Sequence, residues 1–242
     1  MNILKLFINL ILPPRCIKCG KILSEHNGLC PECFSLIDFI SEPYCHICGH
    51  PFSDSTNLKF AEKQICGNCA KDKKHLFAMQ RSAFVYDDNS KQLIIDFKFH
   101  DKTVSAEVLA NMLFVAGKDI WAENPDYLLP VPLHKKRLRT RRYNQSALLC
   151  KYLSRKTMIP TDYFSLERKI NTVPQVTLSG TQRHNNLKKA FVLNNPEKFK
   201  NKSVVLVDDV KTTGSTLREC ALILQKAGAK RLYALTMAKT EN

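Results

Sequence analysis

Eight of the ten cysteines fall into four Cys-x-x-Cys pairs within the first 69 residues. Each pair holds two thiolates on one side of a tight turn, and two pairs complete a tetrahedral site, so four pairs predict two structural Zn²⁺ sites. Four copies in one segment argue against redox dithiols, and the lack of a visible cleavable signal indicates a reducing compartment rather than disulfides. The predicted ligands are Cys16, Cys19, Cys30, Cys33, Cys45, Cys48, Cys66 and Cys69.

The pairing of these four cysteine knuckles is left open by the sequence. Sequential pairing puts ten residues between the first two knuckles and seventeen between the last two, and interleaved pairing is the alternative. Gly20 and Gly49 follow the second cysteine of a knuckle, where a positive φ lets backbone N–H groups point at sulfur. His46 and His50 flank the third knuckle and are alternative ligands. Because large apolar residues are few here, the metal is expected to supply much of the folding free energy.

A second chemical motif begins where the apolar run Val204–Val207 is followed by Asp208 and Asp209. A strand buried on both faces is expected, with the acids at the sheet edge where open α/β sheets bind ligands. The next residues are small and rich in hydroxyls, so their N–H and OH groups suit one phosphate while the acids suit a sugar diol. The motif predicts a ribose phosphate site whose loop is Lys211, Thr212, Thr213, Gly214, Ser215 and Thr216.

The third feature is a concentration of positive charge. Of the formal net charge of +15, +12 lies between Val131 and Phe191, where fourteen Lys and Arg face two acids. Cations bind phosphates and aromatic rings stack on bases, so this composition predicts single-stranded nucleic acid as a ligand. A solvated basic loop or a pyrophosphate clamp are the alternatives. The candidate residues are His134, Lys135, Lys136, Arg137, Arg139, Arg141, Arg142, Tyr143 and Asn144.

The elements that must position these residues alternate between strand-like and helix-like patterns after His75. This alternation predicts that residues 77–242 form an α/β domain with a mostly parallel sheet flanked by helices. Residues 1–76 are expected to form a zinc-binding module that precedes it. Strands are expected at Arg81–Tyr86 and Tyr127–Val131. Helices are expected at Ser90–Phe99, Val104–Trp121, Asn144–Ser154, Thr181–Lys189 with a Ser179/Gln182 capping box, and from Leu217 through Ala221 and Leu224 to Gly228.

The opening segment Ile3–Leu12 is apolar but about half the length needed to cross a bilayer. It is expected to be a helix docked on the rest of the protein. The alternative is a segment that binds weakly to a membrane surface, and no transmembrane span is expected. Cys150 and Cys220 stand outside the knuckles on predicted helices, where small core residues are expected.

The strand, acid pair and hydroxyl-rich loop resemble the signature of type I phosphoribosyltransferases, which bind phosphoribosyl pyrophosphate. The whole chain resembles the ComF family of bacterial competence proteins, including the GntX-type proteins, in which a double zinc ribbon precedes this fold. His100-Asp101 and Arg142 replace glycines usual in the family. The resemblance is carried by Leu12–Cys16, Lys98–Phe99, Pro130–His134, Tyr143–Gln145, Arg168, Thr172, Gln175, Leu178, Arg183, Asn186, Ala190–Phe191 and Asp208–Thr216.

The resemblance implies roles for three loops. Val131–Lys135 corresponds to the pyrophosphate loop, and Gln145 joins the candidate pyrophosphate or nucleic-acid ligands. A mobile loop over the site would contain Arg168, Gln175 and Arg183. In an active enzyme, Mg²⁺ would bridge pyrophosphate and ribose oxygens beside Asp208 and Asp209.

Three functions fit these features. The first is a DNA-uptake factor in natural transformation that binds single-stranded DNA and phosphoribosyl pyrophosphate, in the cytoplasm or peripherally at the inner membrane. The second is a phosphoribosyltransferase with an unidentified acceptor. Because Lys211 and Thr212 occupy the place of the acid that assists the base in purine-salvage enzymes, ligand binding is better supported than transfer. The third is a zinc-knuckle scaffold that recruits helicase or channel proteins.

Overall fold

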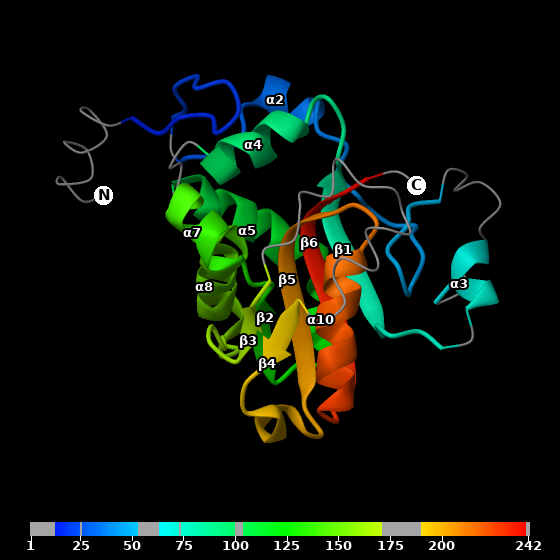
Figure 1. The fold of residues 1–242 in the computed structure, drawn as a ribbon. Helices are drawn as coiled ribbons and strands as arrows, with labels where there is room; N and C mark the ends of the chain where they lie inside the picture. The colour runs from blue at the N-terminus through cyan, green and yellow to red at the C-terminus, as the bar shows by residue number, and fades with distance from the viewer. Residues whose placement is uncertain are drawn as a thin grey trace.

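A parallel β-sheet forms the centre of the computed structural model, which describes residues 13–24, 26–52, 63–72, 74–99, 104–170 and 190–240. Its four strands have the order β1-β6-β5-β2, and every neighbouring pair is parallel. Figure 1 shows the sheet with helices on both sides. The strands are β1 (Met79–Val85), β2 (Tyr127–Pro130), β5 (Ser203–Lys211) and β6 (Arg231–Lys239).

Alternate residues of β5 enter two different cores, as expected for a strand covered on both faces. Val205 and Val207 lie in one core, while Val204 and Leu206 lie in the other. The first core contains side chains of α4 (Lys91–Phe99), α5 (Val104–Ala116), α6 (Lys118–Ala122) and α8 (Gln145–Thr157). The second contains those of α10 (Ser215–Lys226), β3 (Leu166–Arg168), β4 (Phe191–Leu193) and the 3-10 turn η2 (Pro196–Phe199).

The α/β architecture predicted from the sequence is therefore confirmed, including its parallel sheet. Leu217, Ala221 and Leu224 form the buried face of α10, as their spacing predicts. Cys150 and Cys220 are fully buried, one in each core. None of the helices in the described ranges combines the length and apolar character needed to cross a bilayer.

Some boundaries differ from the sequence predictions. The helix predicted over Val104–Trp121 is two helices, because the chain turns at Gly117. The Trp121 indole packs so closely there that a Cβ on Gly117 would come within 2.7 Å of it. β6 and the antiparallel pair β3/β4 were not predicted. The predictions for Ile3–Leu12, Thr181–Lys189 and the capping box lie outside the described residues.

A short helix, α7 (Lys135–Arg141), replaces the loop expected for the basic segment. The His134 imidazole caps its start by accepting a hydrogen bond from Lys136 N at 3.2 Å, and Lys and Arg are themselves good helix formers. Arg142 ends the helix in the left-handed conformation, with φ of 65°. Glycine adopts this conformation without strain, which explains why a glycine is usual at the position of Arg142 in the ComF family.

The cysteine-rich segment covers the free edge of β1. The part of this segment that the structure describes includes two short helices, α2 (Pro31–Ser35) and α3 (Gly67–Lys71). Backbone hydrogen bonds join Ile40 N to Ala83 O at 3.0 Å and Gln80 N to Ile47 O at 2.7 Å. An uncovered edge strand offers unpaired N–H and C=O groups, so these bonds protect the sheet.

Candidate functional site

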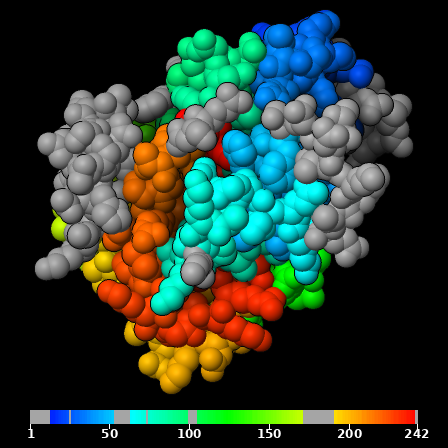
Figure 2. Space-filling model, turned by 90° about the vertical axis from the view of Figure 1, so that its right-hand side faces the viewer, coloured from blue at the N-terminus to red at the C-terminus, as the bar shows by residue number. Residues whose placement is uncertain are grey.

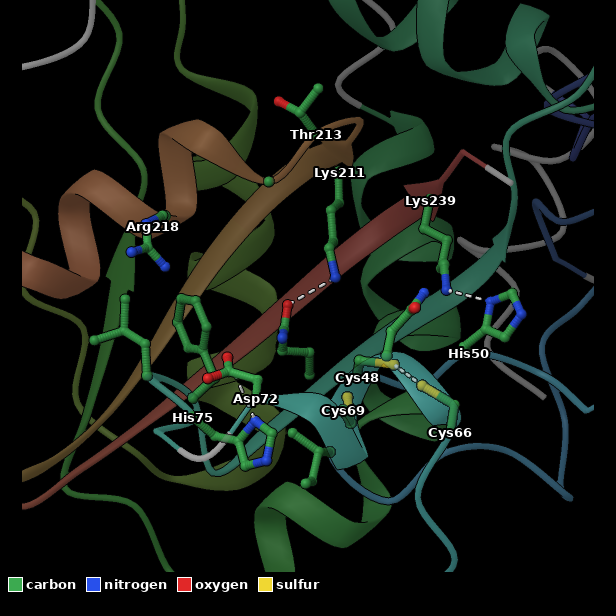
Figure 3. A pocket seen from close by; sticks show the side chains of 16 residues that line it. Cys48, His50, Cys66, Cys69, Asp72, His75, Lys211, Thr213, Arg218 and Lys239 are labelled. Atoms are coloured by element: carbon green, nitrogen blue, oxygen red, sulfur yellow. Dashed lines mark hydrogen bonds and ion pairs between the residues drawn. The ribbon is translucent and has the colours of Figure 1, made fainter. Parts of the chain in front are cut away.

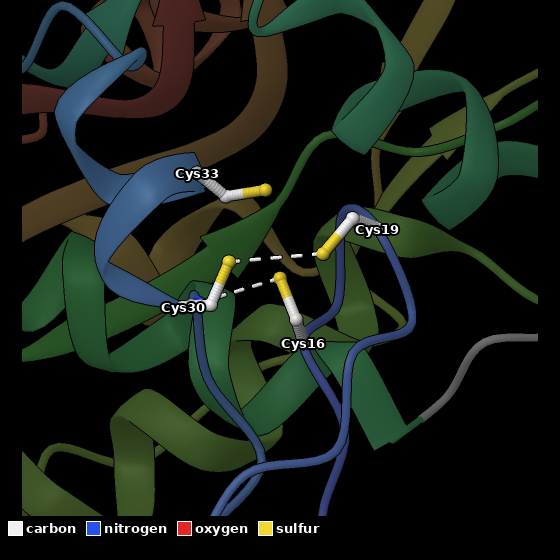
Figure 4. Close-up of side chains that lie close together, drawn as sticks. All are labelled: Cys16, Cys19, Cys30 and Cys33. Atoms are coloured by element: carbon white, nitrogen blue, oxygen red, sulfur yellow. Dashed lines mark hydrogen bonds between the residues drawn. The ribbon is translucent and has the colours of Figure 1, made fainter.

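The eight knuckle cysteines form two separate clusters. One contains Cys16, Cys19, Cys30 and Cys33 (Figure 4), and the other contains Cys45, Cys48, Cys66 and Cys69. Within each cluster the four sulfur atoms lie within 4.8 Å of one another. Four thiolates at this separation are the donor set of a structural Zn²⁺ site, so the pairing is sequential and both sites fit the metal.

The surroundings of the clusters support metal binding. Cys30 N donates to Cys16 Sγ at 3.4 Å and Cys66 N donates to Cys45 Sγ at 3.3 Å, which stabilises thiolates. His50 lies outside the clusters, and its Nδ1 atom is 3.1 Å from Lys239 Nζ. His46 is likewise not among the clustered ligands. Neither histidine considered as a substitute for cysteine belongs to a cluster.

Glycine is required at position 49, where the second ribbon meets the sheet. Its φ is 63°, and a Cβ atom there would lie 2.5 Å from the backbone oxygen of Gln80 in β1. Gly20 has a φ of 78° at the matching position of the first ribbon, as predicted. The Gly49 turn thus allows the second ribbon to approach β1 closely.

The acid pair lies within the last part of β5, which continues to Lys211 beside β6. Asp208 Oδ1 accepts hydrogen bonds from Ser146 Oγ at 3.2 Å and from Asp209 N at 2.9 Å. Lys98 Nζ forms an ion pair with Asp209 Oδ2 at 3.1 Å. Burial, and then the charge of Asp209, raise the pKa of Asp208 to about 7. Such a shifted carboxyl is typical of functional sites.

Lys98 and Ser146 were not among the predicted site residues. The Tyr143 hydroxyl donates to Phe97 O at 2.6 Å, and Gln145 Nε2 donates to Lys98 O at 3.3 Å. These bonds hold the carboxyl end of α4 against the start of α8, which aims Lys98 at Asp209. Lys98–Phe99 and Tyr143–Gln145 are both among the segments that resemble the ComF family. This shared resemblance is the sequence signal that could have linked Lys98 to the site.

The phosphate loop turns at Gly214, which has a φ of 71° and directly precedes α10. Thr213 Oγ1 and Ser215 Oγ lie 3.0 Å apart, and Arg218 N donates to Gly214 O at 2.9 Å as the helix begins. Thr212 and Thr213 are exposed, while Ser215 and Thr216 are half-buried. The Lys211 Nζ atom donates to Gln80 Oε1 in β1 at 2.7 Å.

The residues of the basic segment separate into two groups. Lys135, Lys136, Arg139 and Arg142 are exposed, while Arg137 and Arg141 are half-buried. Burial, and then the charge of Arg141, lower the pKa of Arg137. Like charges therefore crowd on α7, which favours a polyanionic partner.

Tyr143, Asn144 and Gln145 all make contacts that support the fold, and only Gln145 is fully buried. The Tyr143 ring packs against the first core, and Gln145 is buried. Asn144 caps α8 by accepting from Ser146 N at 3.0 Å, and its amide donates to Val131 O at 3.0 Å. The cations, rather than these three residues, are the groups that α7 offers to a ligand.

Arg168 is the described member of the predicted mobile loop. Its guanidinium is buried and lies 5.3 Å from the centre of the Phe191 ring. Its charge interacts with those of Arg137 and Asp208, so it is within electrostatic reach of both α7 and the acid pair. Gln175 and Arg183 lie outside the described residues.

We expect Asp208→Asn to stabilise the protein above pH 7 by roughly 2 kcal/mol. The native carboxyl has a pKa above its ordinary value of 3.8, so between about pH 4 and pH 7 the native chain binds more protons than the unfolded chain. Stability therefore falls as the pH rises through this window, and an uncharged amide avoids the loss. Urea unfolding of both proteins across this pH range measures the difference.

Asp126→Asn is the matched control at the opposite end of β5. The N–H of Ser203 donates to Asp126 at 2.8 Å and, with Lys202, lowers the pKa of that carboxyl. The same substitution should therefore destabilise the protein at neutral pH. An equal loss of stability in both variants would contradict the pKa assigned to Asp208.

Two family models match the chain, the double zinc ribbon domain at residues 7–70 and the phosphoribosyl transferase domain at residues 144–240. The chain is 36% identical over 231 residues to competence protein F of Haemophilus influenzae, covering 93% of this chain and 96% of that protein. It is 32% identical over 238 residues to the DNA utilization protein YhgH of Escherichia coli strain K12, covering 96% and 99%. Competence protein ComFC of Bacillus subtilis is 24% identical over 220 residues, covering 90% and 87%.

Proposed function

Because this chain belongs to the family of competence protein F and the DNA utilization protein YhgH, we propose that it acts in DNA uptake and binds single-stranded DNA in the cytoplasm. The names of these relatives support a role in handling DNA. The observation that carries the proposal is the helix α7, which exposes Lys135, Lys136 and Arg139 and has no acid among its residues.

The contacts of α7 favour a backbone-binding mode. Six cations occur within Lys135–Arg142 and no acid occurs among them. Tyr143 is held by its hydrogen bond to Phe97 O, so α7 offers phosphate contacts rather than a stacking ring. Binding through phosphates is independent of base sequence and weakens steeply with salt.

The same protein would bind phosphoribosyl pyrophosphate or a related ribose phosphate at Asp208, Asp209 and the Thr213–Ser215 turn. Carboxylate oxygens are Mg²⁺ ligands, so the acid pair fits a Mg²⁺ ion that accompanies the sugar phosphate. Lys98 pairs with Asp209 at 3.1 Å and would remain near a ligand that carries several negative charges. The negative charges of such a ligand would add to those of Asp208 and Asp209, so the ligand would attract Lys98 more strongly than the two acids do alone.

Lys135→Ala/Lys136→Ala/Arg139→Ala tests the DNA proposal. All three side chains are exposed, and alanine favours the helix, so the fold should be kept. We expect the logarithmic salt slope of binding to fall by about 2 and the affinity to fall about tenfold or more. Fluorescence anisotropy of a labelled single-stranded oligonucleotide across a salt series measures both quantities.

Lys200→Ala/Lys226→Ala/Lys230→Ala is the control with the same loss of charge. These lysines are exposed and lie near the amino ends of β5 and β6, where Lys230 N bonds to Lys202 O. DNA affinity should change little. Equal losses in the two triple variants would show a general charge effect and contradict a binding role for α7.

A phosphoribosyltransferase activity is the second candidate, favoured by the acid pair with its raised Asp208 pKa beside the phosphate loop. Release of pyrophosphate from phosphoribosyl pyrophosphate in the presence of an acceptor, absent in Asp208→Asn/Asp209→Asn, would support it. Release that persists in that variant would contradict this site as its source.

A further inference from the structure

The end of helix α8 and the turn before β3 carry several exposed aromatic and apolar side chains. Met158 directly follows α8, Phe164 lies in the turn, and each of these side chains is 83% exposed. Tyr163 is 40% exposed, and Phe114 of the neighbouring helix α5 is 36% exposed. This surface, the α8 end face, consists of Phe114, Arg155, Lys156, Met158, Tyr163 and Phe164.

The α8 end face is separate from the sites described above. Ser146, at the start of α8, contacts Asp208, whereas Met158 lies roughly 20 Å further along the helix. Figure 2 shows the cyan residues of the second ribbon and β1 on the same side as the orange start of α10. The pocket between them (Figure 3) is bordered by Lys211 and Thr213 of the phosphate loop, so it belongs to the ribose phosphate site. No residue of the α8 end face lines that pocket.

Contacts between side chains join the α8 end face into one surface. Lys156 Nζ lies 5.7 Å from the centre of the Phe114 ring, which connects α8 to α5. Arg155 is within electrostatic reach of the Tyr163 hydroxyl, which connects α8 to the turn. The Tyr163 and Phe164 rings meet edge to face, with their centres 6.3 Å apart. Residues from three segments of the chain therefore share this surface.

The turn that carries Tyr163 and Phe164 is fixed by hydrogen bonds. Asp162 Oδ1 accepts from Phe164 N at 3.0 Å and from Ser165 N at 2.8 Å. Asp162 N donates to Leu128 O in the edge strand β2 at 2.9 Å. The backbone thus holds the Phe164 ring in solvent. An aromatic side chain that is already held in place loses little conformational entropy when a partner covers it.

The α8 end face is positively charged. Arg155 and Lys156 are exposed, and so is Lys151 one turn earlier. No acidic residue occurs in α8. Among the residues that the structure describes, no carboxylate lies at ion-pair distance from these three cations. The positive charge of the face is therefore available to a partner.

The acids of the neighbouring elements do not neutralise this charge. Asp162 forms an ion pair with Lys198, and Glu123 forms one with Arg231. Glu107 is exposed at the start of α5, two turns before the α5 residue of the face and roughly 10 Å from it along the helix. Electrostatic complementarity therefore favours an acidic partner for the α8 end face.

The composition of the face favours a protein over the other possible partners. Aromatic residues, Met and Arg are the types enriched in protein interfaces. Bases stack on free, parallel ring faces, whereas Lys156 lies over the Phe114 ring and the Tyr163 and Phe164 rings are not parallel. A second copy of this chain is disfavoured, because each copy has a net charge of +15 and the face itself is basic.

We propose that the α8 end face binds an acidic segment of a partner protein that also carries apolar side chains. The apolar side chains of the segment would cover Met158 and Phe164, and its carboxylates would pair with Arg155 and Lys156. This proposal depends neither on DNA binding by α7 nor on the ribose phosphate site.

Fluorescence anisotropy with the full, zinc-loaded chain and a labelled synthetic amphipathic peptide of Glu, Leu and Phe tests the proposal. One twin peptide has Lys in place of Glu, and a second has Ser in place of Leu and Phe. We expect the acidic amphipathic peptide to bind at least about tenfold more tightly than either twin, because both its charge and its apolar side chains are used.

Met158→Asn/Phe164→Ser should weaken binding of the acidic peptide about tenfold. Both side chains are exposed, and Asn tolerates the left-handed conformation of Met158, whose φ is 60°, so the fold should be kept. Ile22→Ser/Phe34→Ser is the matched control, because these side chains are 59% and 56% exposed on the first ribbon. The control should bind the acidic peptide like the natural chain.

Arg155→Gln/Lys156→Gln should also weaken binding of the acidic peptide and reduce its dependence on salt. Lys226→Gln/Lys230→Gln removes the same charge from exposed positions near the end of α10 and should leave the affinity unchanged.

Four results would overturn the proposal. The acidic peptide could fail to bind, or could bind no better than its twins, and either apolar or charge variant could match its control. Met158→Asn/Phe164→Ser could instead weaken binding of a single-stranded oligonucleotide and leave peptide binding unchanged, which would assign the face to nucleic acid. Sedimentation could show a dimer of the natural chain that this variant dissociates, which would assign the face to a second copy.

Discussion

Replacing Cys45 with Ser should abolish zinc binding at the second ribbon and cause a large loss of stability. Cys45 is completely buried, and its sulfur belongs to the second cluster. Structural zinc contributes on the order of 10 kcal/mol to the folding of small zinc modules, because the metal site forms only in the folded state. Metal analysis should show one Zn²⁺ per chain instead of the two expected from the clusters, and circular dichroism should show a lower unfolding temperature.

The loss should extend beyond the ribbon, because the ribbon shares hydrogen bonds with β1. Gln80 N donates to Ile47 O, and the Arg81 guanidinium donates to His46 O at 2.9 Å. Hydrogen exchange should therefore become faster at the amide of Gln80. Cys150→Ser is the control, since Cys150 is also fully buried but lies outside both clusters. Retention of two Zn²⁺ ions by Cys45→Ser would contradict a four-thiolate site.

The number of zinc sites could be predicted from the sequence, whereas their pairing could not. Local spacing defines a knuckle because both thiolates lie on one turn of the chain. Which knuckles meet depends on the tertiary fold, because separations of ten and seventeen residues are compatible with more than one pairing. The bonds from Ile40 and Ile47 to the edge of the sheet connect positions far apart in sequence.

The acid pair was predicted for a similar local reason, and its partners were not. A buried apolar run followed by two acids and hydroxyl residues is contiguous in sequence. Lys98 reaches Asp209 only because Tyr143 and Gln145 fix the end of α4, which is a tertiary arrangement. α7 was missed because its apolar content is low, so helical periodicity gave no signal.

Asp119→Ala should destabilise the protein by about 3 kcal/mol, because it leaves a buried guanidinium without its carboxylate. The side chain of Arg81 is 2% exposed, and its Nη2 lies 2.8 Å from Asp119 Oδ2. The Tyr44 hydroxyl donates to the same carboxylate oxygen at 2.9 Å. The ion pair therefore joins β1, α6 and the second ribbon. Urea unfolding at neutral pH measures the loss.

Three further measurements separate this buried pair from a surface effect. Glu123→Ala removes the carboxylate of the exposed Arg231–Glu123 pair and should have little effect. In a double-mutant cycle, Arg81→Met should cost less in the Asp119→Ala background than in the natural chain, and additive losses would contradict the pair.

Burial tends to raise the pKa of Asp119, but hydrogen bonds from Arg81 and Tyr44 outweigh it and lower that pKa below 3.8. The stabilisation is thus present above about pH 4 and lost in stronger acid, so the natural chain and Asp119→Ala should converge in stability as the carboxylate becomes protonated.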